Sequence, residues 1–288
     1  MIVFQCMKYN KALILGAGGT LGRALKEEFE KNNYEVLAWD RKDGDITSPD
    51  FSLKIKIAKP DVIINATGYN AVDKAEKEEK ELAYKINAEA VGMLANVAKE
   101  MGAVFINYST SYVFDGEKES GYVEDDIPNP VSEYGKSKYE GEKLVQSVGG
   151  KFYIIRLSRL YGARGISPNS KLSFVDIMLS KKSEQEIKVV DEEVSSLIYA
   201  PDLAKFTRTL IEEKKPYGIY HCANLGACTW FEWAKEIFSL IGRGPKLIPV
   251  SASEFSRTAP RPRFCILLNT KMPELRGWKE ALKDYLKF

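Results

Sequence analysis

The strongest constraint on the fold is a run of glycines that follows a short apolar segment. Residues 12–15 are continuously apolar, and Gly16, Gly19 and Gly22 follow in a G-x-x-G-x-x-G pattern. The apolar spacing from 21 to 31 then predicts a helix. A buried strand, a glycine turn and a helix in this order are typical of a dinucleotide-binding loop, where backbone amides approach a pyrophosphate at the helix N-terminus. A purely structural turn is the alternative.

An acidic residue favours the dinucleotide interpretation. The next predicted strand, 34–39, ends at Asp40. In dinucleotide-binding folds, an acidic residue at the end of this strand, roughly 20 residues after the glycine motif, typically hydrogen-bonds the adenosine ribose. Asp40 favours NAD, because a 2′-phosphate beside a carboxylate is repelled. Arg41 and Lys42 follow immediately and could instead bind that phosphate. The choice between NAD(H) and NADP(H) stays open at this point.

Predicted strands alternate with predicted helices over the first half of the chain. This order indicates an α/β fold with a doubly wound parallel sheet, the Rossmann type. After Tyr161 the alternation weakens. We therefore expect an NAD(P)-binding Rossmann domain over residues 7–160, its sheet completed by part of 187–215, and a smaller, mainly substrate-binding C-terminal domain over 161–288. The predicted strands are 12–15, 34–39, 61–65, 103–107 and 152–157, and the predicted helices are 21–31, 51–58 and 72–101.

Composition excludes several classes of function. Lys and Arg number 42 against 40 for Asp and Glu, a net charge of +2, so nucleic acid or an anionic membrane is not an expected partner. Four cysteines without a C-x-x-C pair and a single histidine indicate neither a metal site nor a disulfide framework. No apolar run approaches the roughly 18 residues of a membrane span. We expect a cytoplasmic enzyme, with translation starting at Met1 or Met7.

Thr110, Tyr134 and Lys138 have the side chains needed for hydride transfer to a carbonyl. Tyr134 and Lys138 are four residues apart, so on a helix they share one face. Lowering a tyrosine pKa from 10 to about 7 requires roughly 4 kcal/mol. One ammonium at about 4 Å supplies on the order of 4 kcal/mol at an effective dielectric constant of 20. We therefore expect Tyr134 to act as the acid and Thr110 to hydrogen-bond the same oxygen.

Tyr139 and Lys143 repeat the Y-x-x-x-K spacing. Tyr139 lies five residues after Tyr134, about 140° around a helix, so the two tyrosines cannot face the same site. Gly135 and Ser137 are small and would allow a cofactor close to Tyr134. We therefore expect Tyr134 to be the active residue.

Several longer segments identify a family resemblance that covers nearly the whole chain from Met7. The segments are 61–66 (DVIINA), 71–76 (AVDKAE), 109–116 (STSYVFDG), 134–138 (YGKSK), 189–191, 218–221 and 261–262. Together they resemble the extended short-chain dehydrogenase/reductases and, within them, the dTDP-4-dehydrorhamnose reductases. The resemblance implies an oxidoreductase that reduces the 4-keto group of dTDP-6-deoxy-L-lyxo-4-hexulose to dTDP-L-rhamnose with NADPH or NADH.

The resemblance also implies roles for individual residues. Thr110, Tyr134 and Lys138 would be catalytic, Thr110, Ser111 and Arg159 would contact a nucleotide-sugar substrate, and a homodimer would be the assembly. Some relatives use Mg²⁺, but no spacing here indicates a metal site. The cofactor would be lined by Gly16, Gly18, Gly19, Thr20, Leu21, Gly22, Asp40, Asp45, Ile46, Ala66, Thr67, Gly68, Tyr108, Tyr134 and Lys138.

Two positions depart from the family pattern and leave the sugar and nucleotide open. Ser111 stands where the family has an Asp against the sugar, and Arg159 where it often has a Trp that stacks near the substrate. Arg159 could meet a diphosphate or lie at the surface. Two other functions remain alternatives. One is a nucleotide-sugar epimerase or dehydratase of the same superfamily, although Ser111 argues against a dehydratase. The other is a non-catalytic cofactor-binding regulatory subunit resembling that of methionine adenosyltransferase.

Overall fold

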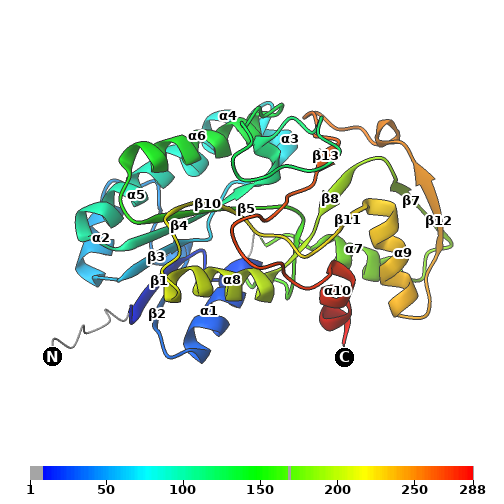
Figure 1. Cartoon of the computed structure of the whole chain (residues 1–288). Helices are drawn as coiled ribbons and strands as arrows, with labels where there is room; N and C mark the ends of the chain where they lie inside the picture. Colours follow the sequence, from blue (N-terminus) through cyan, green and yellow to red (C-terminus); the bar gives the residue numbers. More distant parts are fainter. Residues whose placement is uncertain (1–8, 168–169, 288) are drawn as a thin grey trace.

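A computed structural model describes residues 9–167 and 170–287 as one large sheet, three small sheets and the helices around them (Figure 1). The alternative start at Met7 lies outside the described residues. The strands are β1 (Lys11–Leu15), β2 (Glu35–Trp39), β3 (Val62–Asn65), β4 (Val104–Thr110), β5 (Phe152–Leu157), β6 (Leu160–Tyr161), β7 (Glu186–Val190), β8 (Val194–Ser196), β9 (Ile198–Tyr199), β10 (Gly218–His221), β11 (Ala227–Thr229), β12 (Lys246–Val250) and β13 (Phe264–Cys265).

None of the described helices is both long enough and apolar enough to cross a membrane. The α-helices are α1 (Thr20–Lys31), α2 (Phe51–Ala58), α3 (Val72–Ala75), α4 (Lys80–Tyr84), α5 (Ala90–Met101), α6 (Glu133–Val148), α7 (Phe174–Ser180), α8 (Ala200–Glu212), α9 (Trp230–Leu240) and α10 (Trp278–Leu286).

The large sheet is parallel throughout and confirms the predicted doubly wound α/β class. Its strand order is β10-β5-β4-β3-β1-β2. The chain leaves β1 in one direction to form β2 and returns to the other side for β3. A ligand of such a sheet binds where the order reverses, beyond the carboxyl ends of β1 and β3. The glycine motif begins at this edge, because Gly16 follows the last residue of β1.

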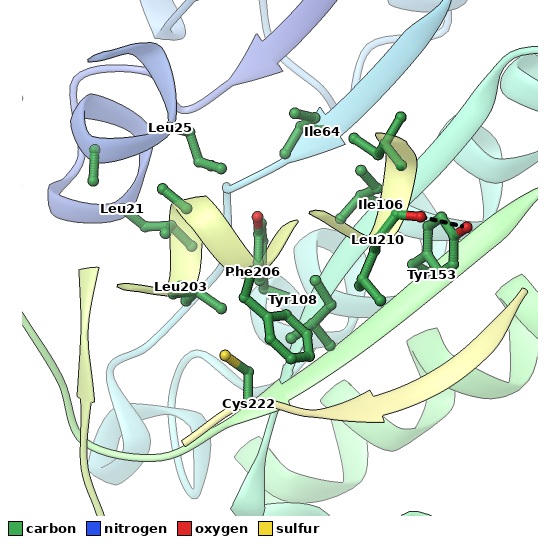
Figure 2. Packing of buried hydrophobic residues seen from close by; sticks show 14 of the residues in the cluster. Leu21, Leu25, Ile64, Ile106, Tyr108, Tyr153, Leu203, Phe206, Leu210 and Cys222 are labelled. Carbon is green, nitrogen blue, oxygen red and sulfur yellow. Dashed lines mark hydrogen bonds between the residues drawn. The ribbon is translucent and has the colours of Figure 1, made fainter. Parts of the chain in front are cut away.

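Both faces of the sheet are covered because β1, β3 and β4 are apolar on both sides. Side chains alternate along a strand, so Ala12 and Ile14 face one core and Leu13 and Leu15 the other. The first core is closed by α1 and α8, whose Leu21, Leu25, Leu203, Phe206 and Leu210 pack against Ile64 and Ile106 (Figure 2). The second core is closed by α2, α5 and α6.

Two expectations about the fold need correction. The predicted helix over 72–101 is interrupted, with a π-helical turn at Lys85–Glu89. A turn over residues 76–79 also separates α3 from α4. Asn87 in the π-helical turn is buried, and its side chain bonds Tyr69 and Ser137, which accounts for that turn. The sixth strand of the sheet is β10, which lies beyond the expected range 187–215. That range contributes α8 to the face of the sheet instead.

A separate buried cluster lies among the later elements. Tyr161, Val175, Ile187, Trp233 and Leu282 form part of it, contributed by β6, β7, α7, α9 and α10. Two small sheets, β12-β7 and β11-β8-β13, adjoin this cluster. Figure 1 shows these elements grouped at one end of the large sheet.

Candidate active site

The glycine motif forms a tight turn that only glycine tolerates at two positions. Gly16 has a φ of +76°, and its amide donates to the Trp39 carbonyl oxygen at 2.8 Å. A Cβ atom at Gly22 would lie 2.1 Å from the Gly16 carbonyl oxygen. The first turn of α1 therefore packs directly on the loop that precedes it.

The N-terminus of α1 is a favourable binding site for an anion. Gly19 is the N-cap residue, and no side chain accepts a hydrogen bond from the first turn of the helix. Free amides at the N-terminus of a 12-residue helix favour a phosphate group. Asp40 lies beside Gly18, since a Cβ there would meet the Asp40 carboxylate at 2.4 Å. These residues fit a dinucleotide with its pyrophosphate over the turn and its ribose near Asp40.

A later segment covers the glycine turn. The amides of Ile166 and Ser167 donate to the Gly18 carbonyl oxygen at 2.8 and 3.2 Å. Arg23 of α1 donates to the Arg164 carbonyl oxygen at 2.6 Å. No local sequence pattern indicated this contact, because it joins residues far apart in the chain.

Thr110, Tyr134 and Lys138 come together at the carboxyl ends of β3 and β4. Ser132 caps α6 by accepting a hydrogen bond from the Gly135 amide at 3.2 Å, so that Tyr134 lies in the first turn. Thr110 is the last residue of β4 and shares a hydrogen bond with the Tyr134 hydroxyl. The Lys138 ammonium donates to the Tyr108 carbonyl oxygen at 3.3 Å and lies 2.8 Å from where a Cβ at Gly68 would be.

The residues after β3 also lie at this edge. Thr67 donates through its hydroxyl to the buried Asn65 side chain at 2.5 Å, and the Asn65 amide donates to Asn107 at 2.8 Å. The carbonyl oxygen of Ala66 lies 3.0 Å from where a Cβ at Gly16 would be. Ala66 and Thr67 therefore lie against the glycine turn, and Gly68 lies against Lys138.

The tyrosine pKa expected from sequence differs from that in the structure. Burial raises the pKa of Tyr134 to about 12, although its hydrogen bond with Thr110 acts in the opposite direction. Burial lowers the pKa of Lys138 to about 8, partly offset by the Glu142 carboxylate. The attraction expected between the pair is not among the causes of either pKa shift, and the ammonium donates to the Tyr108 carbonyl oxygen instead. Tyr134 is therefore a neutral phenol at pH 7 and can donate a proton.

The buried Lys138 is expected to destabilise the folded protein at neutral pH. The folded state binds fewer protons than the unfolded state between pH 8 and 10.5, so stability rises with pH across this window. We expect Lys138→Met to raise the free energy of unfolding at pH 7 by about 2 kcal/mol, an advantage that disappears near pH 10.5. Urea unfolding of both proteins at several pH values measures this difference in the free energy of unfolding. Lys136→Met, on the exposed side of α6, should change little, and a Lys138→Met protein less stable than wild type at pH 7 would contradict the prediction.

The second Y-x-x-x-K pair lies elsewhere on α6. Tyr139 packs against the cluster that contains Val113 and Phe114, while Lys143 lies over the Tyr139 ring at 5.4 Å and pairs with Glu140. Neither residue contacts Thr110.

The interpretation of the small residues beside Tyr134 was wrong. A Cβ at Gly135 would lie 2.2 Å from the Tyr112 carbonyl oxygen, and the buried Ser137 hydroxyl donates to the Tyr134 carbonyl oxygen at 2.8 Å. Gly135 and Ser137 thus pack α6 against the protein rather than leave room for a cofactor.

Other expected cofactor residues lie at different places. The Tyr108 side chain points toward α8 and bonds Thr207 at 2.8 Å, so only its carbonyl oxygen faces Lys138. Leu21 is part of the hydrophobic core, whereas Thr20 begins α1. Asp45 accepts hydrogen bonds from Thr47, which lower the pKa of the carboxyl group. Ile46 packs on the second core.

Ser111 directly follows Thr110, and Arg159 lies among residues of β11, α9 and the turn at Glu193. Ser111 is buried, and its hydroxyl forms no hydrogen bond of normal geometry within the described part of the chain. Arg159 has a φ of +37°, a strained conformation that costs about 1–3 kcal/mol. Its guanidinium lies 3.7 Å from the centre of the Trp230 ring. An aromatic ring thus lies against Arg159, and it comes from α9, which no local pattern indicated.

The comparison with known proteins decides the family. The family model described as the RmlD substrate binding domain matches residues 10–288. The chain belongs to this family. Among the residues that the structure describes, no group of three or more His, Cys, Asp or Glu side chains could hold a metal ion.

Members of the RmlD family from several bacteria are similar to this chain over nearly its full length. The dTDP-4-dehydrorhamnose reductase of Aggregatibacter actinomycetemcomitans is 35% identical over 294 residues, which cover 95% of this chain and 97% of that protein. The crystal structure of the Clostridium acetobutylicum dTDP-4-dehydrorhamnose reductase ortholog has a TM-score of 0.89 and 41% identity, covering 96% and 98% of the two chains. The Bacillus anthracis dTDP-4-dehydrorhamnose reductase in complex with NADP has a TM-score of 0.91 and 36% identity, covering 96% and 99%.

Proposed function

We propose that this member of the RmlD family is an NAD(P)H-dependent oxidoreductase that reduces the 4-keto group of dTDP-4-dehydrorhamnose to give dTDP-rhamnose. One observation carries the proposal: Thr110, Tyr134 and Lys138 meet at the sheet edge where the glycine turn begins. The relatives named above support it, because they are dTDP-4-dehydrorhamnose reductases and one holds NADP.

In the proposed reaction each residue of the trio has one task. A bound nicotinamide supplies the hydride that reaches the carbonyl carbon. Tyr134, protonated because burial raises its pKa to about 12, donates a proton to the carbonyl oxygen as negative charge develops there. Thr110 hydrogen-bonds the same oxygen. Lys138, beside Gly68 and the Tyr108 carbonyl oxygen, would hold the cofactor.

Consumption of NADPH and NADH with dTDP-4-dehydrorhamnose, followed at 340 nm, tests the proposed function. Turnover that yields dTDP-rhamnose is the expected result. Tight cofactor binding without turnover would favour the regulatory subunit. Isomerisation of a nucleotide sugar without net consumption of reduced cofactor would favour the epimerase.

We expect NADPH to bind more tightly than NADH. Arg41 and Lys42 are exposed directly after β2, next to Asp40, where they can meet a 2′-phosphate. Replacing both by Ala is expected to weaken NADPH binding about 10-fold or more and to leave NADH binding nearly unchanged. Fluorescence titration measures both affinities. Lys31→Ala, an exposed change at the end of α1, is the matched control, and equal losses for the two cofactors would exclude this role.

The domain division, assembly and location are also proposals. We propose a cofactor unit over 7–160 joined by α8 and β10, and a mainly substrate-binding unit from the rest of 161–288. The separate cluster around Trp233 supports this division. The family resemblance supports a cytoplasmic homodimer. Light scattering should then give twice the 32.4 kDa mass of one chain, and fractionation of cells should recover the protein in the cytoplasm.

A further inference from the structure

The Arg159 side chain is held by groups from two segments, one at Glu193 and one at Cys228–Trp230. Its two terminal nitrogens donate to the carbonyl oxygens of Cys228 and Glu193 at 3.0 and 2.8 Å. Its guanidinium stacks on Trp230 at 3.7 Å. The indole nitrogen of Trp230 in turn donates to the Glu193 carboxylate at 2.9 Å, which fixes the ring. Such a fixed guanidinium is pre-organised to bind a ligand with little further loss of side-chain freedom.

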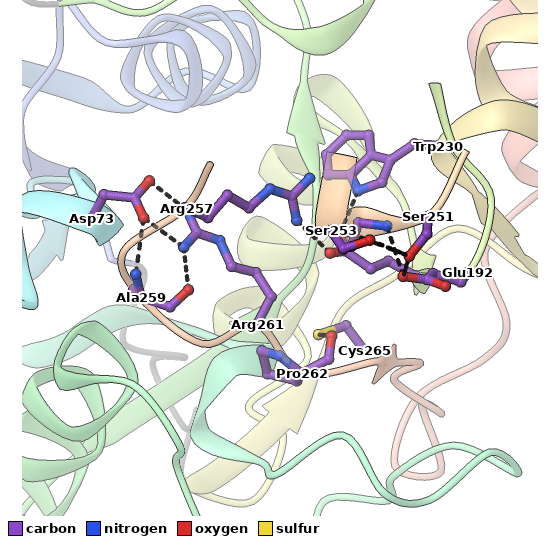
Figure 3. A network of polar contacts seen from close by, with 12 residues as sticks. Asp73, Glu192, Trp230, Ser251, Ser253, Arg257, Ala259, Arg261, Pro262 and Cys265 are labelled. Atoms are coloured by element: carbon purple, nitrogen blue, oxygen red, sulfur yellow. Dashed lines mark hydrogen bonds and ion pairs between the residues drawn. The ribbon is translucent and has the colours of Figure 1, made fainter. Parts of the chain in front are cut away.

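The charge of Arg159 is not neutralised by the protein. No carboxylate forms an ion pair with it in the described part of the chain, whereas Arg257 pairs with Glu193. Arg261 pairs with Asp73 (Figure 3). The Glu193 carboxylate is engaged by Arg257 and Trp230, so only its backbone oxygen is left for Arg159. A partly buried cation without a counter-ion favours an anionic ligand.

Tyr112 connects Arg159 with Tyr134, since Arg159 acts electrostatically on Tyr112 and the Tyr112 ring contacts the Tyr134 ring. The rings of Tyr112 and Tyr134 meet edge to face with centroids 5.8 Å apart. The charges of Arg159 and Arg261 both act on Tyr112 and oppose the rise in its pKa caused by burial. Arg261 is paired with Asp73, and the Glu193 carboxylate acts on the pKa of Tyr112 in the direction opposite to the two arginines.

We propose that the guanidinium of Arg159, stacked on Trp230, binds an oxyanion of the nucleotide-sugar substrate. This inference rests on the proposed reductase function and extends it to substrate selection. A guanidinium has five N–H donors in a planar fork, and its two backbone contacts leave donors for the two oxygens of a phosphate or carboxylate. For the 6-deoxy keto sugar of the proposed function, which has no carboxylate, this oxyanion is the diphosphate; recognition of a sugar carboxylate is the competing outcome and would overturn this assignment.

Binding of three probes to wild type and to Arg159→Met tests the proposal and separates the two sources. The probes are dTDP, dTDP-glucose and dTDP-glucuronate, measured by calorimetry. A diphosphate ligand predicts at least 10-fold weaker binding of all three to the variant. A sugar carboxylate predicts this loss for dTDP-glucuronate alone. Equal affinities of wild type and variant for all three probes would overturn the proposal.

Three controls separate a binding role from a structural role. NADPH affinity should be unchanged in Arg159→Met, because Arg159 contacts Cys228, Glu193 and Trp230 rather than the glycine turn, and this measurement also reports folding. Arg159→Lys keeps the charge without the planar fork and should lose part of the probe affinity, so it serves if the Met variant is unfolded. Arg243→Met, an exposed change, should bind every probe like wild type. If wild type binds the probes through Arg159 but reduces no keto sugar, the proposed function fails while the anion site stands.

Discussion

Tyr134→Phe is expected to lower kcat for keto-sugar reduction about 10³-fold, the typical contribution of a positioned acid. The change removes one hydroxyl, which bonds Thr110 and lies 3.4 Å from the Asn70 side-chain oxygen, and leaves the ring against Tyr112. The proton then has to come from water. Single-turnover oxidation of NADPH, measured beside NADPH affinity, separates lost chemistry from lost cofactor binding, and the affinity should stay within about threefold of wild type.

Tyr139→Phe is the matched control for this prediction. Tyr139 is on the same helix and four residues before a lysine, but it faces the cluster with Phe114. We expect its activity to remain within about twofold of wild type. Full activity in Tyr134→Phe together with a large loss in Tyr139→Phe would transfer the acid role to Tyr139.

Arg156→Met is expected to lower the free energy of unfolding by about 3–5 kcal/mol, because it leaves the Glu142 carboxylate buried and unpaired. Arg156 and Glu142 are 1% and 0% exposed, and the guanidinium donates to both carboxylate oxygens at 2.9 and 2.7 Å. The same guanidinium contacts the Glu124 carbonyl oxygen and the His221 ring. Urea unfolding followed by circular dichroism measures the loss.

The double variant Arg156→Met with Glu142→Leu should recover most of that stability, since both buried charges are then absent. Lys26→Met breaks an exposed i,i+4 pair with Glu30 and should cost less than 1 kcal/mol. An Arg156→Met protein that is as stable as the Lys26→Met control would show that the buried pair contributes nothing.

Local sequence patterns were sufficient to predict those features of the fold and the family that depend on residues close together in the chain. Continuous apolar strands with glycines at the end of β1 predicted a doubly wound α/β fold, and the parallel sheet confirms it. The motif segments predicted the family, which the match over residues 10–288 confirms. The pKa of Tyr134 could not be predicted, because it is set mainly by burial, which depends on elements far along the chain.

The sequence by itself determined the alternation of strands and helices as far as β5, the glycine turn and the shared helix face of Tyr134 and Lys138, since each depends on residues a few positions apart. Only the tertiary structure decided that Trp230 stacks on Arg159, that Asn87 interrupts the long helix, and that β10 completes the sheet. These contacts join residues distant in sequence, and packing rather than local conformational preference selects them.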